Sequence, residues 1–229
     1  MASSQKLVKN KRSVTGDKDR SRRFNDSRFL IRILVGIVLV GSIAVVFGWI
    51  FDVTVLKSIL PKFVAMKFIT ALSFFFSSIL VLLLAKKGKG EISKLFIIII
   101  SSTLLLLMTI FLVSFFWGFT TGLENLFVQE LPGAIHTIIP GLPAVPTLIG
   151  FLLISLSGLV FSFNPQKPWG IFFFGLLISL IGVVAIVGYL FDIPMLYYSF
   201  SGYTPIAVNA SFLFILLGVS LILFGSEHK

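Results

Sequence analysis

The sequence has no cysteine and only two histidines, and only 12% of its 229 residues are charged. Without cysteine the chain forms neither disulfides nor thiolate metal sites, and it gives no information on redox compartment. His136 is the only histidine outside the last two residues. It has no partner at a metal-ligand spacing and no second axial ligand for haem within an apolar run. We therefore expect no cofactor and no bound metal.

Charged residues are also missing from the middle of the long apolar runs. No Asp, Glu, Lys, Arg or His lies near the midpoint of any of these runs. Proton relays, ion pathways and retinal sites in membranes depend on such groups. Their absence argues against a coupled transporter.

What the sequence has in abundance is apolar surface. Hydrophobic residues make up 57% of the chain, and its mean hydropathy is +1.06. Six runs each approach the roughly 20 residues that a helix needs to cross a bilayer. They are Phe29 to Phe51, Ala65 to Ala85, Leu95 to Phe119, Ala144 to Phe163, Trp169 to Phe191, and Pro205 to Phe224. The sequence predicts an all-α polytopic membrane protein with six transmembrane helices.

The basic residues predict the orientation of these helices. Ten of the nineteen Lys and Arg lie between Lys6 and Arg32, and the connection at residues 86–94 is also basic. By the positive-inside rule both termini are cytosolic, and we expect a location in the cell membrane. Residues 1–28 have too little apolar content to fold, so they read as a disordered basic cytosolic tail. Residues 29–224 form the membrane domain and 225–229 a second cytosolic tail. Basic residues without interleaved aromatics do not favour nucleic-acid binding.

An internal repeat appears when the sequence is shifted by 140 residues without gaps. The segment GWIFDVTVL, from Gly48, then aligns with GYLFDIPML, from Gly188, and Phe74 aligns with Phe214. A weaker middle copy aligns Thr147, Phe151 and Ser155 with Thr70, Phe74 and Ser78. We predict three helical hairpin repeats, with short interfacial helices on the outer side.

Asp52 and Asp192 occupy equivalent places after the first and fifth runs. A carboxylate is unfavourable at a helix C-terminus, so each Asp is interpreted as the N-cap of a short interfacial helix, Val53 to Leu60 or Ile193 to Ser199. The alternative is a pair of carboxylates that face an external cleft.

Other polar residues have competing structural and functional interpretations. Thr121 and Glu124 have the spacing of a capping box. Glu130 and His136 share one loop and could form an acid–base or metal pair. Thr70 and Asn209 lie in spans, where they either pack helices together or face a ligand pocket near the outer leaflet. Further residues are expected at the interface: Lys67 by snorkelling to the headgroups, and Trp49 and Tyr189 in the outer aromatic belt.

The segments Gly48 to Phe75 and Gly188 to Gly218 resemble the multi-span amino-terminal region of many prokaryotic sensor histidine kinases. The residues that carry the likeness are Met66, Thr70, Ala71, Leu72 and Phe74 in the first segment and Tyr203, Thr204, Pro205 and Ala207 in the second. The resemblance implies a membrane sensor or input region. The sequence has no phospho-accepting histidine segment and no Gly-rich ATP-binding region, so no kinase domain is expected in it.

These observations favour a protein without catalytic activity, an input-like module that acts through lateral contact with a partner in the bilayer. A membrane-embedded kinase, a complex subunit or a second copy of the chain would be such a partner. The alternatives are a small permease or channel subunit, and a structural subunit of a membrane complex.

Overall fold

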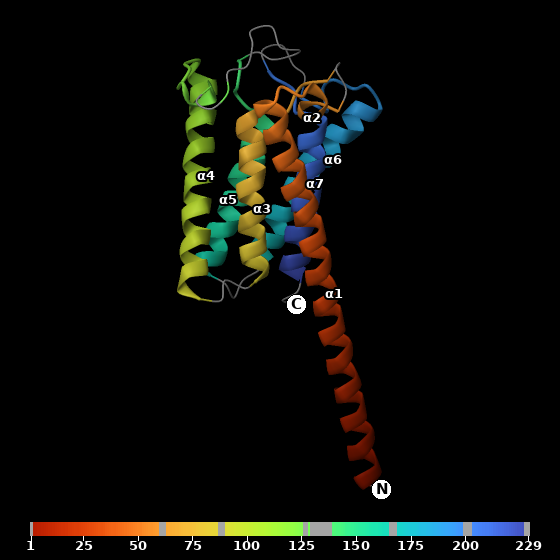
Figure 1. Ribbon diagram of the computed structural model, residues 1–229. Helices are drawn as coiled ribbons and strands as arrows, with labels where there is room; N and C mark the ends of the chain where they lie inside the picture. Colours follow the sequence, from red (N-terminus) through yellow and green to blue (C-terminus); the bar gives the residue numbers. More distant parts are fainter. Residues whose placement is uncertain are drawn as a thin grey trace.

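The computed structural model describes residues 2–59, 63–86, 90–125, 128, 139–164, 169–198 and 203–226, with side chains from residue 26 onward. Every regular element in these ranges is helical. Six long helices run side by side, and both termini lie at the same end of the bundle (Figure 1). The elements are α1 (Ala2–Ile50), α2 (Thr54–Lys57), α3 (Phe68–Ala85), α4 (Glu91–Trp117), the 3-10 helix η1 (Leu123–Asn125), α5 (Val145–Phe163), α6 (Trp169–Leu190) and α7 (Val208–Ser226).

The six predicted spans are confirmed. The helices long and apolar enough to cross a membrane are Asp26–Ile50 within α1, together with α3, α4, α5, α6 and α7. Their ends lie within a few residues of the apolar runs, because the thickness of the hydrocarbon core sets the length of each run. The chain is therefore an all-α, polytopic integral membrane protein.

The spans form three hairpins, α1 with α3, α4 with α5, and α6 with α7, and each pair packs closely. Each outgoing helix also contacts the returning helix of one other hairpin, α1 with α7, α4 with α3, and α6 with α5. In the most apolar stretch of the returning helices 56–61% of the residues are buried, against 28% in each outgoing helix. The returning helices α3, α5 and α7 therefore form an inner ring, and α1, α4 and α6 form an outer ring that faces lipid.

The inner ring closes around three phenylalanines, which we call the aromatic triad: Phe74, Phe151 and Phe214. All three side chains are fully buried. The ring centroids are 4.8 Å apart for Phe74–Phe151, 4.7 Å for Phe74–Phe214 and 5.1 Å for Phe151–Phe214. These are the residues that the repeat aligns, so the bundle has an approximate threefold arrangement with one ring from each hairpin at its centre. Edge and tilted ring contacts add about 0.5 to 1.5 kcal/mol per pair beyond simple burial.

Close helix packing explains why glycine occupies two positions of the spans. A methyl group at Gly150 would lie 2.7 Å from the Phe214 ring, and one at Gly158 would meet the Ser101 hydroxyl. Small residues let helices approach in lipid, where van der Waals packing and not water exclusion drives association. Gly150 and Gly158 thus serve the packing between helices.

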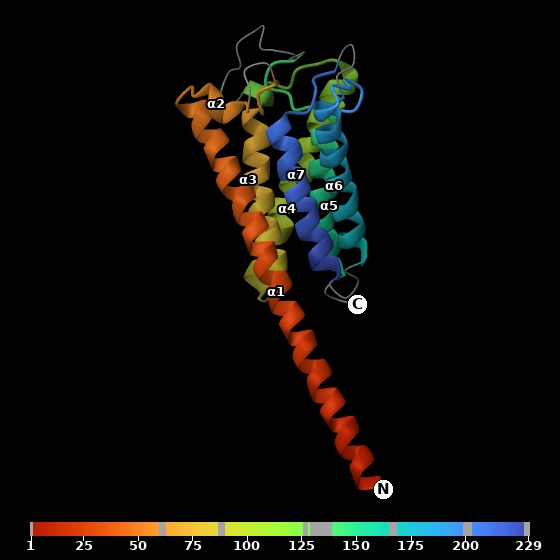
Figure 2. The ribbon, with the colours of Figure 1, turned by 90° about the vertical axis from the view of Figure 1, so that its right-hand side faces the viewer.

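The first helix differs from the expected disordered tail. Its backbone is helical from Ala2 onward, and the helix extends well beyond the rest of the bundle (Figure 2). A helix already nucleated by a span extends at little cost per residue, even where the composition is polar. Low apolar content predicted a disordered tail, whereas the structure describes residues 2–28 as part of one continuous helix.

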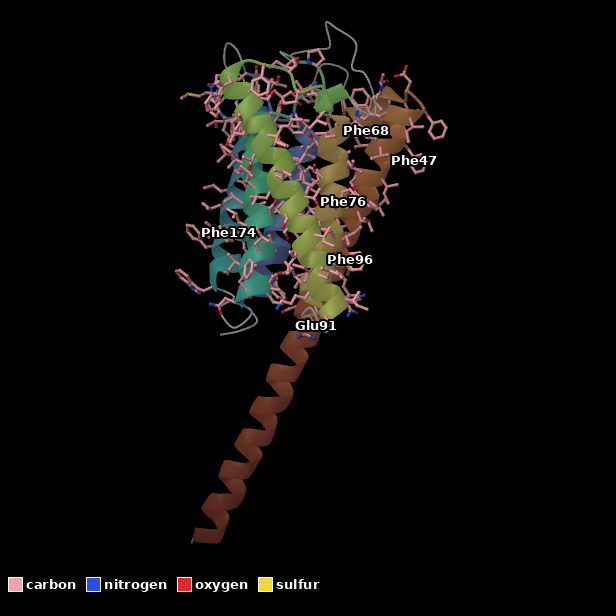
Figure 3. The ribbon with its side chains drawn as sticks, turned by 90° about the vertical axis from the view of Figure 1, so that its left-hand side faces the viewer. Phe47, Phe68, Phe76, Glu91, Phe96 and Phe174 are labelled. Atoms are coloured by element: carbon pink, nitrogen blue, oxygen red, sulfur yellow. The ribbon has the colours of Figure 1, made fainter. Side chains whose placement is uncertain are left out.

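Large apolar side chains cover the flank of the bundle, as Phe47, Phe76 and Phe96 illustrate (Figure 3). These three side chains are 49%, 38% and 53% exposed, respectively. In water such a surface would be unfavourable, whereas lipid tails solvate it.

Candidate ligand cavity at the crown

The end of the bundle opposite the C-terminus carries α2, η1 and the turns at residues 191–198, and we call this end the crown (Figure 1). Here the three hairpins turn back into the inner ring. A cavity of about 10 Å³ lies among the turning segments. It is lined by Val64, Ala65, Met66, Lys67, Thr70, Ala144, Thr147, Thr204, Pro205, Ala207 and Ala210.

The inner helices α3, α5 and α7 all begin at this cavity. Lys67 and Ala144 are the N-cap residues of α3 and α5, and Ala207 directly precedes α7. Neither N-cap side chain accepts a hydrogen bond from the first turn. The first N–H groups of a helix have no partner within that helix, and they carry the positive end of its dipole. Three positive helix ends therefore converge on one small space.

Lys67 corrects the interfacial expectation. Lys67 is only 3% exposed and lines the cavity, so its side chain does not snorkel to the headgroups. The repeat explains why: Lys67 stands where the other two hairpins have Ala144 and Ala207, which also line the cavity. This position faces the bundle axis in all three hairpins, whatever residue occupies it.

Three threonine residues line the same space, and two of them are equivalent in the repeat. Thr70 and Thr147 are 3% and 2% exposed and occupy equivalent positions of the first two hairpins. Ala210 is their counterpart in the third. Of the two interpretations of Thr70, helix packing and a ligand pocket, its place on the cavity wall corresponds to the pocket. The repeat singles out Thr147 but does not show that it lines a cavity, and the sequence does not identify Lys67 and Thr204 as cavity residues.

Asp52 and Asp192 are not N-caps. The N-cap of α2 is Val53, which makes no side-chain capping bond, and residues 194–198 form turns where a second interfacial helix was expected. Both aspartates adopt left-handed backbone conformations, with φ of 55° and 53°. The N–H of Val53 donates to the Gly48 carbonyl at 2.8 Å, and that of Ile193 donates to the Gly188 carbonyl at 2.8 Å. Each aspartate is thus the left-handed residue of a Schellman motif that ends the preceding helix.

The Schellman geometry also answers why carboxylates tolerate a helix C-terminus. Asp is among the residues that enter the left-handed region at low cost. Asp52 Oδ1 accepts a hydrogen bond from Lys57 Nζ at 2.5 Å, and this ammonium also lies 4.7 Å from the centroid of the Trp49 ring. The Lys57 ammonium holds the pKa of Asp52 below its usual value. Asp52 and Asp192 are exposed and neither lines the cavity, so the cleft alternative has no support here.

The third hairpin repeats this arrangement with different chemistry. Tyr197 occupies the position of Lys57 and stacks on Tyr189 with ring centroids 4.2 Å apart. Burial, and to a lesser degree the Asp192 carboxylate, raises the pKa of the Tyr197 hydroxyl. The Tyr189–Tyr197 stack in the third hairpin thus takes the place of the Trp49–Lys57 cation–π pair in the first.

The aromatic residues Trp49 and Tyr189 do more than set membrane depth. Trp49 Nε1 donates to the Met66 carbonyl at 2.8 Å, and the Tyr189 hydroxyl donates to the Ile206 carbonyl at 2.7 Å. The two acceptors occupy equivalent positions of the repeat. Each bond ties an outer helix to the segment that leads into the inner ring, and so fixes the wall of the cavity.

Asn209 links the first and third hairpins. Its Nδ2 donates to the Lys57 carbonyl at 3.1 Å, and the same carbonyl accepts the Met66 N–H at 2.9 Å. Asn209 does not line the cavity. Of its two interpretations, the geometry therefore supports packing between hairpins.

Glu124 forms one half of the expected capping box. Its Oε1 accepts the Thr121 backbone N–H at 3.0 Å, whereas the Thr121 hydroxyl accepts the N–H of Leu123 at 3.2 Å and not that of Glu124. Burial opposes ionisation, but these backbone hydrogen bonds prevail and leave the pKa of Glu124 lowered. Glu130 and His136 lie outside the described residues, and no metal-binding group of acidic or histidine side chains occurs within the described ranges.

No family model matches this chain, and no curated protein and no solved structure shows significant similarity to it.

Proposed function

We propose that the chain is an input module of a membrane signalling system, which receives a small ligand at the crown and acts on a membrane-embedded partner protein. In this proposal the crown faces outward and both termini are cytosolic, in agreement with the basic residues near the N-terminus. The module itself catalyses no reaction. The resemblance to sensor regions of histidine kinases supports the same role.

The observation that carries the proposal is the position of the aromatic triad below the cavity. Phe74, Phe151 and Phe214 each follow a cavity-lining residue of the same helix by four residues, which is about one helical turn. Three fully buried rings with centroids about 5 Å apart leave no passage between the inner helices. A ligand that enters the crown therefore cannot pass along the axis between α3, α5 and α7.

Because the aromatic triad blocks this axis, the structure favours a receptor over the alternative of a small permease or channel. An ion that crosses the hydrocarbon core needs replacement ligands at depth. Below the cavity the inner helices offer rings and hydroxyls, and several of those hydroxyls already donate within their own helix, as Ser78 does to the Phe74 carbonyl at 2.8 Å. A signal would instead leave laterally, through the apolar faces of α1, α4 and α6.

Two measurements test this function. Purified protein in liposomes should give no flux of protons, potassium or chloride above that of empty liposomes. A reproducible current that Asn209→Leu abolishes would contradict the proposal and favour the permease.

The second measurement joins a histidine kinase catalytic region after Lys229 and follows autophosphorylation in membranes. Thr147→Val, at the cavity, should change the kinase activity, whereas Thr54→Val, exposed on α2 and outside the cavity lining, should not. Equal activity of the wild type and both variants would contradict a receiving role for the crown.

A further inference from the structure

We infer that the chain forms a symmetric homodimer through the outer face of α4, with the α4 helices of two copies packed in parallel against each other. This inference goes beyond the proposed function, because it requires neither a ligand at the crown nor a kinase. Three features of α4 support it: the exposure of its outer face, the spacing of the residues there and the hydroxyls among them.

The outer face of α4 is uncovered along the length of the helix (Figure 3). Exposed residues follow one another on it at alternating intervals of three and four. We call them the α4 seam: Leu95, Ile99, Ser102, Leu106, Thr109 and Val113. The buried residues Ile97, Leu104 and Phe111 repeat every seven residues on the opposite side, against the bundle. A seven-residue repeat is the pattern of left-handed helix pairs, so the seam has the spacing of a second packing face.

The α4 seam carries exposed hydroxyls, which the other two outer helices lack. Ser102 and Thr109 lie near the middle of the span Glu91–Trp117, whereas the exposed residues of α6, and of α1 from Ile33 onward, are all apolar. Thr109 donates to the Leu105 carbonyl at 2.7 Å, but the Ser102 hydroxyl makes no hydrogen bond within the described residues. Lipid tails offer such a hydroxyl no partner, so a facing helix with a polar side chain at the same depth removes an unfavourable exposure.

A second copy of the chain supplies that facing helix. Two copies insert in the same orientation, because the same basic residues orient each, so their α4 helices run parallel with Ser102 at equal depth. A twofold axis along the seam sets Ser102 opposite its counterpart, where one hydroxyl donates and the other accepts. Ile99, Leu106 and Val113 then occupy the a positions of a heptad, and two of these are β-branched, as in parallel two-stranded coiled coils. The small Ser102 and Thr109 at d positions let the helices approach closely.

Cysteine cross-linking tests the α4 seam, because the chain has no native cysteine. The full chain in liposomes is oxidised with copper phenanthroline at decreasing ratios of protein to lipid. Leu106→Cys should give disulfide-linked dimers in a yield that persists on dilution. Leu180→Cys, on the outer face of α6, is the matched control, since the two leucines are 64% and 51% exposed and both lie near the middle of their helices. It should give only the yield of random collisions, which falls on dilution.

The second measurement counts copies by single-molecule photobleaching of chains labelled at the N-terminus, over the same dilution series. The wild type should show two copies per particle. Ser102→Phe places a bulky ring in the seam and should raise the Kd of the dimer about tenfold or more, whereas Leu180→Phe should leave it unchanged. Ser102 is exposed, so this substitution leaves the packed side of α4 intact.

Single copies of the wild type at every dilution would overturn the inference and leave the seam to a different membrane protein. Equal cross-linking yields for Leu106→Cys and Leu180→Cys would overturn it as well, and so would an equal Kd for Ser102→Phe and Leu180→Phe. Neither measurement uses a ligand, an ion gradient or a kinase, so failure of the dimer is distinguishable from failure of the proposed function.

Discussion

The substitution of Asp192 by serine or by glycine separates two explanations of the repeated aspartates. Asp192 has φ of 53°, where a Cβ atom costs roughly 1 to 2 kcal/mol in most residues. Glycine avoids this cost but loses about 0.5 to 1 kcal/mol through the entropy of the unfolded chain. Asp192→Gly should therefore be nearly neutral, and Asp192→Ser should lower the free energy of unfolding by about 1 kcal/mol. Asp192 is the better test site because Asp52 also pairs with Lys57.

An N-cap role predicts the opposite order. Serine is as good an N-cap as aspartate, and glycine is weaker by a few tenths of a kcal/mol. The assay is reversible unfolding of the purified protein in mixed micelles with increasing SDS, monitored by tryptophan fluorescence and circular dichroism. A serine variant as stable as the wild type, or more stable than the glycine variant, would refute the Schellman assignment.

Three further predictions concern packing, the walls of the cavity and pH. Gly150→Ala should lower the free energy of unfolding by about 1 to 3 kcal/mol, since the new methyl meets the aromatic triad at 2.7 Å, whereas Gly36→Ala, with no atom within 4 Å, should be neutral or stabilising. Tyr189→Phe leaves the Ile206 carbonyl without its donor and should lower the free energy of unfolding by about 1 kcal/mol in the same assay. Lys57 lowers the pKa of Asp52 from 3.8, so the pair stabilises the folded state above about pH 4. This contribution is lost as the pH falls through the pKa of Asp52 in the folded state. Lys57→Met should abolish this pH dependence of the free energy of unfolding, measured across about pH 2 to 6.

The sequence was sufficient to predict the spans, and its repeat aligned the residues that meet at the centre of the fold. Span length follows from the thickness of the bilayer, so each apolar run maps onto one helix. The aligned positions Phe74, Phe151 and Phe214 meet at the axis because equivalent residues of a repeat face the same way. Periodicity and repetition are properties of the chain itself, and they carry over directly into three dimensions.

The conformation at Asp52 and the burial of Lys67 were not predicted. A polar residue between two helical segments has the same pattern whether it caps the second helix or ends the first, and only the backbone angle distinguishes the two. For Lys67, proximity to a span end favoured snorkelling. The alignment with Ala144 and Ala207 could have shown that Lys67 is buried, because small residues at equivalent places of the repeat indicate a position that faces the axis.

The distinction between a closed receptor and a conducting protein is tested most directly by cysteine accessibility below the aromatic triad. The chain has no native cysteine. Single cysteines at Ile59 in the crown and at Lys86 at the opposite end of the bundle serve as references for the two sides, since both positions are exposed. Ser78 is fully buried and follows Phe74 by one turn of α3. With an impermeant thiol reagent, Ile59→Cys should react from outside the cell and Lys86→Cys only in inside-out vesicles, while Ser78→Cys should react from neither side. Labelling of Ser78→Cys from the crown side would show an open axis and contradict the non-conducting input module.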